Sequence, residues 1–455
     1  CGYIGDDTGD NISERNANFC ELTGLYWAAH NIDSDYIGIV HYRRYFASRR
    51  KSRFADKKSR VISHEELCSI LATTNVVLPK ERHYFIETNY TQYIHAHHKQ
   101  DLEVTRAIIA RKCPEYLPAY DLYMSKTHGH HFNMFVMKKE LLQHYCAWLF
   151  DILFELEKEL AEFVGKDEAL CFSTGFTVNE GIIPAVVGRG DYIICDDRDH
   201  ASIVDGRRLS FATQLKYKHN DMEDLEKELQ KCEPDAVKLI IVDGVFSMEG
   251  DLANLPEIVR LKKKYNASIY VDEAHGLGVF GKQGRGVCDH FGVTEDIDLI
   301  MGTFSKSLGF IAGDKEVINW LRHNARSYIF QASSTPAATA AAREALHIIK
   351  SEPERIQRLW DITNYALKSF RDAGFEIGET ESPIIPLYVR DTEKTFVVTK
   401  MAFDEGIFIN PVIPPACAPQ DTLVRVALMA THTKEQVDYA VEKLTKCFRE
   451  LGIIK

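Results

Sequence analysis

Residues 268–275 (SIYVDEAH) and residues 297–307 (IDLIMGTFSKS) are the two stretches that decide the fold. Each opens with a short apolar run, which is typical of a buried strand. The first run ends at Asp272 and the second leads to Lys306. Because neighbouring parallel strands end at the same edge of a sheet, we expect this acid and this amine to approach each other there.

An acid and a lysine in this arrangement are what pyridoxal phosphate chemistry needs. The amine of Lys306 would hold the cofactor as a Schiff base, and Asp272 would keep the ring nitrogen protonated so that the ring acts as an electron sink. Lys306 taken alone is more simply interpreted as a surface residue. The letters DEAH at residues 272–275 also occur in ATP-driven helicases, but this chain has no G-x-x-x-x-G-K-[ST] phosphate loop.

Strands and helices alternate around these stretches. We predict strands at residues 192–195, 238–242, 268–271, 299–301 and 310–312, and helices at residues 222–230 and 255–265. This order indicates an α/β fold with a mostly parallel sheet and helices on both faces. A smaller α+β domain is predicted from strands at residues 384–389 and 423–428 and a last helix at residues 434–450.

Composition and charge exclude several classes of protein. The 455 residues carry a net charge of −11, whereas a nucleic-acid-binding protein normally presents a basic face. No apolar stretch approaches the roughly 18 residues of a membrane span, and we expect a cytoplasmic protein without a transmembrane helix. The 11 cysteines include no C-x-x-C pair, which favours reduced thiols over a disulfide framework or a metal site.

Polar motifs also follow the other predicted strands. Phe172–Thr177 is a Gly turn that opens a helix, and its free N–H groups suit a phosphate, although an ordinary helix start is the simpler interpretation. Asp199–Ser202 and Asp243–Ser247 each follow a predicted strand, where a hydrogen-bonded histidine and a turn are the simpler interpretations. Together, the motifs gather at the strand ends, where open α/β sheets bind ligands.

From about Leu160 to Lys455, these motifs resemble those of the α-oxoamine synthases, a branch of the fold-type I pyridoxal phosphate enzymes. The resemblance is carried by Phe172–Asn179, His200–Gly206, His219–Asp221, Phe246–Asp251, Val271–Gly278, Gly302–Leu308 and Arg425–Thr433. Within the family, the chain is most similar to bacterial serine palmitoyltransferases and glycine acetyltransferases. The resemblance implies a cofactor-binding large domain at residues 159–330 and a small C-terminal domain at residues 331–455.

The resemblance implies a role for each residue around the cofactor ring. Lys306 would carry the cofactor and later remove the α-proton of the amino acid. Asp272 would pair with the ring nitrogen, and His200 would stack on the face of the ring. His275 would contact the ring hydroxyl, with Ser247 nearby.

The resemblance also places the cofactor's phosphate at the start of a helix. Thr174, Gly175 and Phe176 would contact the cofactor there, chiefly through backbone N–H groups, together with the hydroxyl of Thr303. Thr335 would reach the phosphate in a neighbouring subunit, because active sites of this family lie at the interface of a homodimer.

The activity implied is the condensation of serine or glycine with an acyl-CoA, with loss of CoA and carbon dioxide, to give an α-oxoamine. Arg425 would hold the carboxylate of the amino acid through paired charged hydrogen bonds. Two departures from the family could impair this activity. Its N-terminal Asn-x-Tyr-Leu-Gly and Gly-Ser-Arg elements are absent. The turn after Lys306 is about four residues shorter, and a misplacement of about 1 Å can cost on the order of 100-fold in rate.

Residues 1–158 resemble a different family, a truncated α/β domain of bacterial capsular-polysaccharide glycosyltransferases. The match rests on Gly9–Ser13, Glu21–Trp27, Ile39–Phe46, His95–His98, Phe132–Phe135 and Leu149–Leu153. We predict a helix at residues 19–31 and a buried strand at residues 36–40, after which His41 and Arg43 would face a donor diphosphate. Surface charge is the alternative interpretation of Arg43 and its neighbour Arg44.

Three alternatives stay open for the N-terminal third and the whole chain. His95, His97 and His98 could be metal ligands, but i and i+2 on a strand share a face without converging, so we expect no metal site. The family changes within Phe154–Leu160, inside a charged run that predicts a joining helix. The chain could therefore also be a polysaccharide glycosyltransferase with a passenger domain, or a fusion fragment without catalytic activity.

Overall fold

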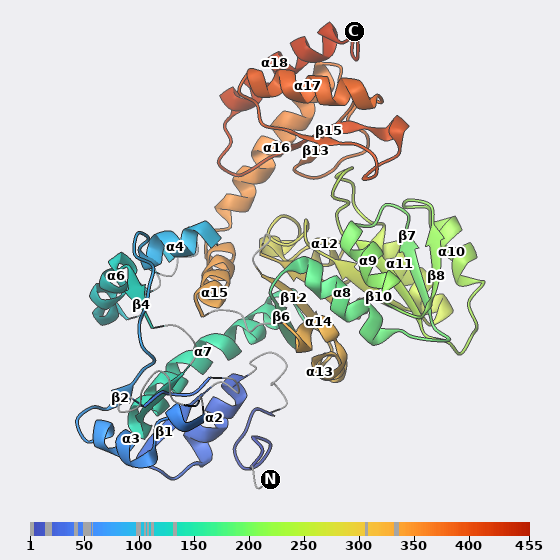
Figure 1. The fold of residues 1–455 in the computed structure, drawn as a ribbon. Coiled ribbons are helices and arrows are strands. Elements are labelled where there is room, and N and C mark those ends of the chain that lie inside the picture. The colour runs from blue at the N-terminus through green and yellow to red at the C-terminus, as the bar shows by residue number, and fades with distance from the viewer. Residues whose placement is uncertain are drawn as a thin grey trace. The chain divides into compact units, whose positions relative to one another are not determined.

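The structure is a computed structural model that describes residues 4–13, 21–40, 44–48, 56, 58–96, 102–103, 106, 109–110, 113–130, 134–304, 308–331 and 336–455. The chain divides into two compact units (Figure 1). The first unit comprises Cys1–Glu157 with Ile329–Glu344, and the second comprises Lys158–Tyr328 with Ala345–Lys455. The domain boundaries predicted at residues 158 and 330 stay predictions.

A seven-stranded sheet organises the second unit (Figure 1). Its strands in spatial order are β6 (Glu168–Phe172), β12 (Gly309–Gly313), β11 (Leu299–Thr303), β10 (Ser268–Asp272), β9 (Lys238–Asp243), β7 (Tyr192–Asp196) and β8 (Thr213–Tyr217). The pairings from β11 across to β8 are parallel, and β12 runs antiparallel to both β11 and β6. The prediction of a mostly parallel α/β sheet is confirmed.

The inner strands of this sheet are largely apolar and buried, as expected where both faces are covered, whereas the edge strand β8 is mostly exposed. Successive residues of a strand point to opposite faces, and all six residues of β9 are buried. The connecting helices are α8 (Gly175–Val186), α9 (Ala201–Arg208), α10 (Met222–Leu229), α11 (Leu255–Tyr265), α12 (Val287–His290), α13 (Lys315–Asn324) and α14 (Arg326–Ile329). Helix α8 packs against β6, β11 and β12, which places its first residues beside the end of β11.

The C-terminal part of the second unit is the predicted α+β structure. Its antiparallel sheet has the order β13 (Ile384–Tyr388), β15 (Leu423–Ala427) and β14 (Asn410–Val412). Its helices are α16 (Glu354–Asp372), α17 (Thr392–Asp404) and α18 (Lys434–Glu450). A cluster of buried apolar side chains, including Phe370, Val398 and Phe448, forms its core.

The first unit contains shorter strands. Its elements are α2 (Glu21–Asn31), β1 (Tyr36–Ile39), α3 (His64–Leu71), β2 (Val76–Val77), β3 (Arg82–His83), α4 (Asn89–Ala96), α6 (Leu117–Ser125), β4 (His128–Gly129) and β5 (Phe135–Lys138). An antiparallel sheet has the order β1-β5-β2, and β3 pairs with β4. The predicted helix at residues 19–31 appears as α2 and the predicted strand at residues 36–40 as β1. The prediction that this strand is buried was wrong, because only one of the four residues of β1 is buried.

The placement of His95 on a strand was wrong, because His95 lies in helix α4. Reciprocal hydrogen bonds between the backbone N–H groups and hydroxyls of Thr88 and Thr91 start this helix. The Nδ1 atom of His95 lies 2.6 Å from Glu87. His97 and His98 lie outside the described residues, as do His41 and Arg43, whereas Arg44 is exposed.

Two long helices connect parts of the chain that belong to different units. Helix α7 (Lys139–Val164) contains the predicted junction, residues 154–160, and α15 spans Pro336–Ser351. Single turns of 3-10 helix lie at η2 (Lys58–Arg60), η3 (Pro114–Tyr116), η4 (Lys282–Gly284), η5 (Thr294–Asp296) and η6 (Pro419–Asp421). In the described part of the chain, no helix has the length and apolar character to span a membrane.

Candidate active site

Polar residues lie together where the parallel strands of the large sheet end. Asp272 is the last residue of β10, Asp243 the last of β9 and Thr303 the last of β11. In the register of the sheet, Asp272 is opposite Asp243 on one side and Met301 on the other. The predicted acid therefore lies at the centre of the edge at which these strands end.

Asp272 is a buried carboxyl with neutral hydrogen-bond donors. Its side chain is 3% exposed. Its Oδ2 atom accepts a hydrogen bond of 2.8 Å from the amide of Asn179, and its Oδ1 atom accepts one of 2.9 Å from the backbone N–H of Ala274. Burial raises the pKa of Asp272, and these hydrogen bonds counteract part of that rise.

Two further buried acids stand beside Asp272. Burial raises the pKa of Asp243 well above its ordinary value, and the charge of Asp272 raises it further. Burial also raises the pKa of Asp199, whose Oδ1 accepts from the backbone N–H of Asp243. The Oδ2 atom of Asp199 is buried and has no hydrogen-bond partner among the described residues. A positive charge at this edge would compensate the cost of burying these carboxyls.

Hydrogen bonds hold His200 at the edge of the sheet where β9 and β10 end. Its backbone N–H donates to Asp243 over 2.8 Å, and the residue caps the start of α9. Its Nδ1 atom accepts from the backbone N–H of Ser202 and lies 2.8 Å from the Ser202 hydroxyl. An accepting Nδ1 leaves the proton of the neutral ring on Nε2. The residue is exposed, so the ring is accessible to a ligand.

The start of helix α8 lies against the end of β11. Thr174 caps the helix by accepting from the backbone N–H of Thr177 at 3.2 Å. A Cβ atom on Gly175 would lie 2.9 Å from the terminal methyl of Met301 and 3.3 Å from Cβ of Thr303, so the helix start and the end of β11 are closely packed. Phe176 is 41% exposed. The first N–H groups of a helix attract anions, which makes this junction suitable for a phosphate.

Arg425 reaches this region from the small sheet. It lies on β15, and its Nη1 atom donates to the backbone carbonyl of Ser247 over 2.8 Å. Burial lowers the pKa of Arg425, and its Nε atom is buried without a hydrogen-bond partner among the described residues. A guanidinium in this state suits a carboxylate, which would supply both charge and an acceptor. Ser247 is buried, whereas His275 is exposed in the turn after β10.

Two of the predicted site residues, Lys306 and Thr335, lie outside the described residues. On either side of Lys306, the backbone N–H of Phe304 donates to the carbonyl of Leu308 over 2.8 Å. Thr303, which opens this connection, donates its hydroxyl to the same carbonyl.

No role was assigned from the sequence to Asn179 or to Ser202, which belong to the site. Asn179 bridges Asp272 and Ser202, and its amide nitrogen lies 2.8 Å from an oxygen of each. The available signal was an amide side chain one turn after Gly175, next to the apolar Val178. The next acid, Glu273, has a structural role, because its carboxylate accepts from the backbone N–H groups that open α12.

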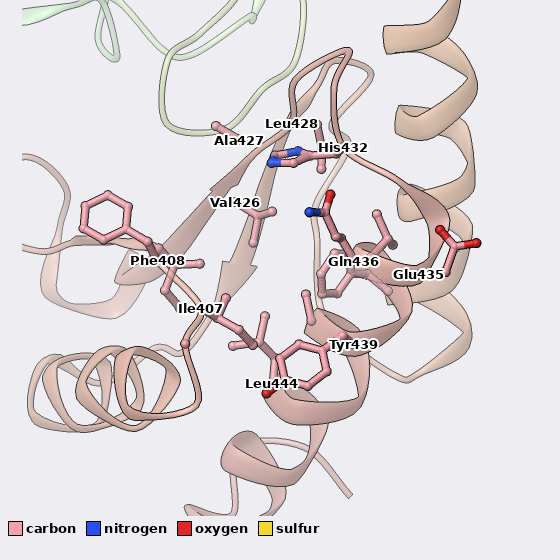
Figure 2. Close-up of a pocket in the computed structure, with 15 residues that line it drawn as sticks. Ile407, Phe408, Val426, Ala427, Leu428, His432, Glu435, Gln436, Tyr439 and Leu444 are labelled. Carbon is pink, nitrogen blue, oxygen red and sulfur yellow. The ribbon is translucent and has the colours of Figure 1, made fainter.

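A separate pocket lies in the C-terminal part of the second unit (Figure 2). It has a volume of about 460 Å³ and is lined mainly by apolar residues of β15, of α18 and of the segment before β14. Figure 2 shows His432 and Gln436 among its polar side chains. The predicted site residues within the described chain are not part of its lining, so the pocket is distinct from the strand-end site.

The comparisons with known families divide the chain in two. Residues 149–444 match the family Aminotransferase class I and II, and residues 1–169 match a family described as Domain of unknown function (DUF4422). The chain belongs to the aminotransferase class I and II family of enzymes. The two matches overlap at residues 149–169, a range that includes the predicted junction at residues 154–160.

Named relatives match the C-terminal two thirds of the chain. The serine palmitoyltransferase of Bacteroides ovatus is 80% identical over 308 residues, which are 67% of this chain and 78% of that protein. That of Sphingobacterium spiritivorum is 53% identical over 67% of this chain and 77% of that protein. The 8-amino-7-oxononanoate synthase of Thermosipho melanesiensis is 44% identical over 68% of this chain and 80% of that protein.

Solved structures agree with this assignment. The serine palmitoyltransferase of Sphingomonas wittichii superposes with a TM-score of 0.64 and 37% identity, over 66% of this chain and 77% of that one. A structure of SPT with PLP has a TM-score of 0.64 and 34% identity, over 67% and 78% of the two chains. The predicted family, the fold-type I architecture and the cofactor, pyridoxal phosphate, are confirmed.

The geometry of the site fits this cofactor. The buried Asp272, which lacks a hydrogen bond from a charged donor among the described residues, suits a protonated ring nitrogen. The first turn of α8, which begins at Gly175, suits a phosphate because its N–H groups point out of the start of the helix.

Proposed function

We propose that this chain condenses serine or glycine with an acyl-CoA, with loss of CoA and carbon dioxide, to form an α-oxoamine. The observation that carries the proposal is the buried Asp272 at the end of β10, tied by hydrogen bonds to the elements that hold His200. Relatives that are 80% identical and are named serine palmitoyltransferase support it.

Each side chain of the edge has a task in this reaction. Pyridoxal phosphate, when bound, supplies an electron sink for the α-carbon of the amino acid. Asp272 would hold a proton on the ring nitrogen, and burial strengthens that interaction because the local dielectric is low. His200 would pack against the ring face, and His275 and Ser247 would lie at its hydroxyl side.

The two ends of the ligand would be held by opposite charges. Thr174, Gly175 and Phe176 would hold the phosphate through the start of α8. The hydroxyl of Thr303, which donates to the carbonyl of Leu308 in this structure, would turn to the phosphate when the cofactor binds. Arg425 would bind the carboxylate of the amino acid, which would give its buried Nε a partner. The amino acid would thus be fixed before its α-proton is removed.

Lys306 is proposed as the base that takes the α-proton. A lysine amine serves this purpose when burial and nearby cations lower its pKa toward neutrality. Lys306 follows β11 by three residues in the sequence, and β11 ends at the same edge of the sheet as β10.

The test is titration of the purified chain with pyridoxal phosphate, followed by assays of CoA and carbon dioxide release with serine or glycine and acyl-CoAs of increasing length. We expect a visible absorbance band that Lys306→Ala removes, and product formation that requires both substrates. The Arg425→Lys variant should raise the KM for the amino acid far more than that for acyl-CoA. Absence of the band in the unmodified chain would refute the proposal.

We also propose a cytoplasmic homodimer in which Thr335 reaches the site of the neighbouring subunit. The support is the dimeric site implied by the family resemblance. Sedimentation of the chain, whose mass is 51.9 kDa, should give a species of twice that mass. A monomer that binds the cofactor with the same affinity as the dimer would contradict the shared site.

The interpretation of residues 1–158 as a glycosyltransferase domain stays a prediction, since the matching family has no stated function. It predicts hydrolysis of a nucleotide-sugar donor by this chain. A fusion fragment without activity predicts neither donor hydrolysis nor cofactor binding.

A further inference from the structure

We propose that Asn179 is a positioning residue that joins Asp272 to His200, so that the acid and the imidazole are held as one hydrogen-bonded group. The inference rests on the proposed function, in which both residues contact the cofactor. It assigns Asn179 and Ser202 to that function although neither reaches the reacting atoms in this proposal.

The connection is continuous from the acid to the imidazole. Asn179 is fully buried, and its amide nitrogen donates to Oδ2 of Asp272 and to the hydroxyl of Ser202, each over 2.8 Å. Both hydrogens of the amide are thereby used. The Ser202 hydroxyl, having accepted from Asn179, has its own hydrogen directed to Nδ1 of His200 at 2.8 Å.

The orientation of the Asn179 amide is fixed from its other side. The hydroxyl of Tyr270 donates to the amide oxygen of Asn179. Tyr270 and Asp272 are two residues apart on β10 and therefore point to the same face of the sheet. A flipped amide would place its oxygen against the carboxylate and its nitrogen against a donor, so this strand selects one orientation.

Close packing of two helices brings Ser202 within reach. Asn179 lies on α8, and Ser202 lies on α9 on the same side as Gly206, one turn later. A Cβ atom at Gly206 would lie 2.5 Å from the backbone oxygen of Asn179. A glycine at this position is therefore needed for α9 to approach α8 closely enough for the hydrogen bond.

The hydrogen bond from Asn179 also controls the charge of Asp272. Burial raises the pKa of this carboxyl, while the donors Asn179 and Ala274 lower it. The titratable groups that face it from the neighbouring elements are His200, Asp199, Asp243, Glu273 and Tyr270. Three of these are acids, so loss of the amide would leave Asp272 protonated to a higher pH.

The first experiment measures the affinity for pyridoxal phosphate against pH by equilibrium dialysis. Asn179→Ala should weaken binding roughly 10- to 100-fold near neutral pH, as expected for loss of a hydrogen bond to a charged group. The loss should shrink as the pH rises, because Asp272 then ionises without help. The matched control is Val178→Ala, which removes a fully buried neighbour without a polar contact.

The second experiment needs no cofactor. Nitrogen-15 spectra of the histidine-labelled protein, assigned with His200→Gln, report the tautomer of His200. The unmodified chain should show the Nε2–H form, and Ser202→Ala should shift the Nδ1 resonance of His200, because Nδ1 loses the hydroxyl hydrogen bond and keeps only the one from the backbone N–H of residue 202. Tyr270→Phe, which removes one hydroxyl and preserves the ring, should have the same effect to a smaller extent.

These results separate the two proposals. An unmodified chain that fails to bind pyridoxal phosphate would end the proposed function, and the histidine spectra would still decide the connection. An unchanged Nδ1 resonance in Ser202→Ala, or a pH profile shifted as much by Val178→Ala as by Asn179→Ala, would overturn the role of Asn179.

Discussion

The large sheet of the second unit and the small sheet of the first unit differ in how deeply they bury their strands. All six residues of β9 are buried, whereas β1 in the first unit buries one of its four residues. Parallel strands require a crossover between each pair, so their ends collect residues from distant parts of the chain at one edge. Antiparallel pairs such as β1 and β5 place successive strand ends on opposite edges.

This difference in strand direction and burial explains why the candidate active site lies at an edge of the large sheet. Asn179 and Asp272 are 93 residues apart in the chain, yet they share a hydrogen bond because α8 and β10 lie in the same parallel architecture. Buried surroundings then perturb the pKa of each acid at that edge. The comparison teaches that a site can be sought at the carboxyl ends of buried parallel strands before any ligand is known.

The largest effect is expected for Asp272→Asn, which removes the acid from this edge. Loss of one partner of a buried ion pair costs about 3–5 kcal/mol, so affinity for pyridoxal phosphate should fall roughly 100- to 4,000-fold. Equilibrium dialysis measures this affinity. Asp404→Asn, at an exposed position on α17, is the control and should change nothing. Equal losses in both variants would mean that burial at the sheet edge is irrelevant to binding.

Substitutions in the cores of the two units should differ in their effect on cofactor binding. Leu170 on β6 and Leu142 on α7 are both fully buried. Replacing either with alanine should lower the free energy of unfolding of its region by about 2–5 kcal/mol. Only Leu170→Ala should also weaken cofactor binding, because β6 leads directly into the helix that starts at Gly175. Chemical denaturation with a parallel cofactor titration tests this, and the comparison fails if Leu142→Ala weakens binding as strongly.

A smaller effect concerns pH and His219, whose imidazole lies 3.0 Å from Asp196 and 2.9 Å from Asp251. Burial by itself lowers the pKa of His219, but hydrogen bonds to the two acids outweigh it and raise the pKa from 6.5 to about 10. The resulting stabilisation, on the order of a few kcal/mol, should be complete below about pH 6.5 and lost as the pH rises toward 10.

Denaturation at pH 6, 8 and 9.5 should therefore show a declining stability that His219→Gln flattens. The second unit contains this group, so the decline should appear in its unfolding and not in that of α2 or β5. A profile that is the same in both proteins would show that the two acids do not hold a charged imidazole.

Much of the fold follows from local patterns. Helices at residues 255–265 and 434–450 agree with the structure at both ends, and their starts are fixed by Asn254 and Thr433, which cap them with side-chain oxygens. The strand assignment of His95 failed because a Thr88–Thr91 capping interaction starts a helix there. The polar ends of β9, β10 and β11 were found because an apolar run stops abruptly at each.

The sequence alone identified five of the seven strands of the large sheet, and that an apolar run ends at Asp272, because apolar runs and caps are properties of neighbouring residues; it did not identify β6 and β8. Only the tertiary structure decided that Asn179 serves both Asp272 and Ser202, and that Arg425 has a buried Nε without a partner. Those contacts depend on strand order and on the approach of two helices at Gly206. The strand order and the approach of the helices cannot be derived from spacing along the chain, since side-chain partners are set by three-dimensional packing.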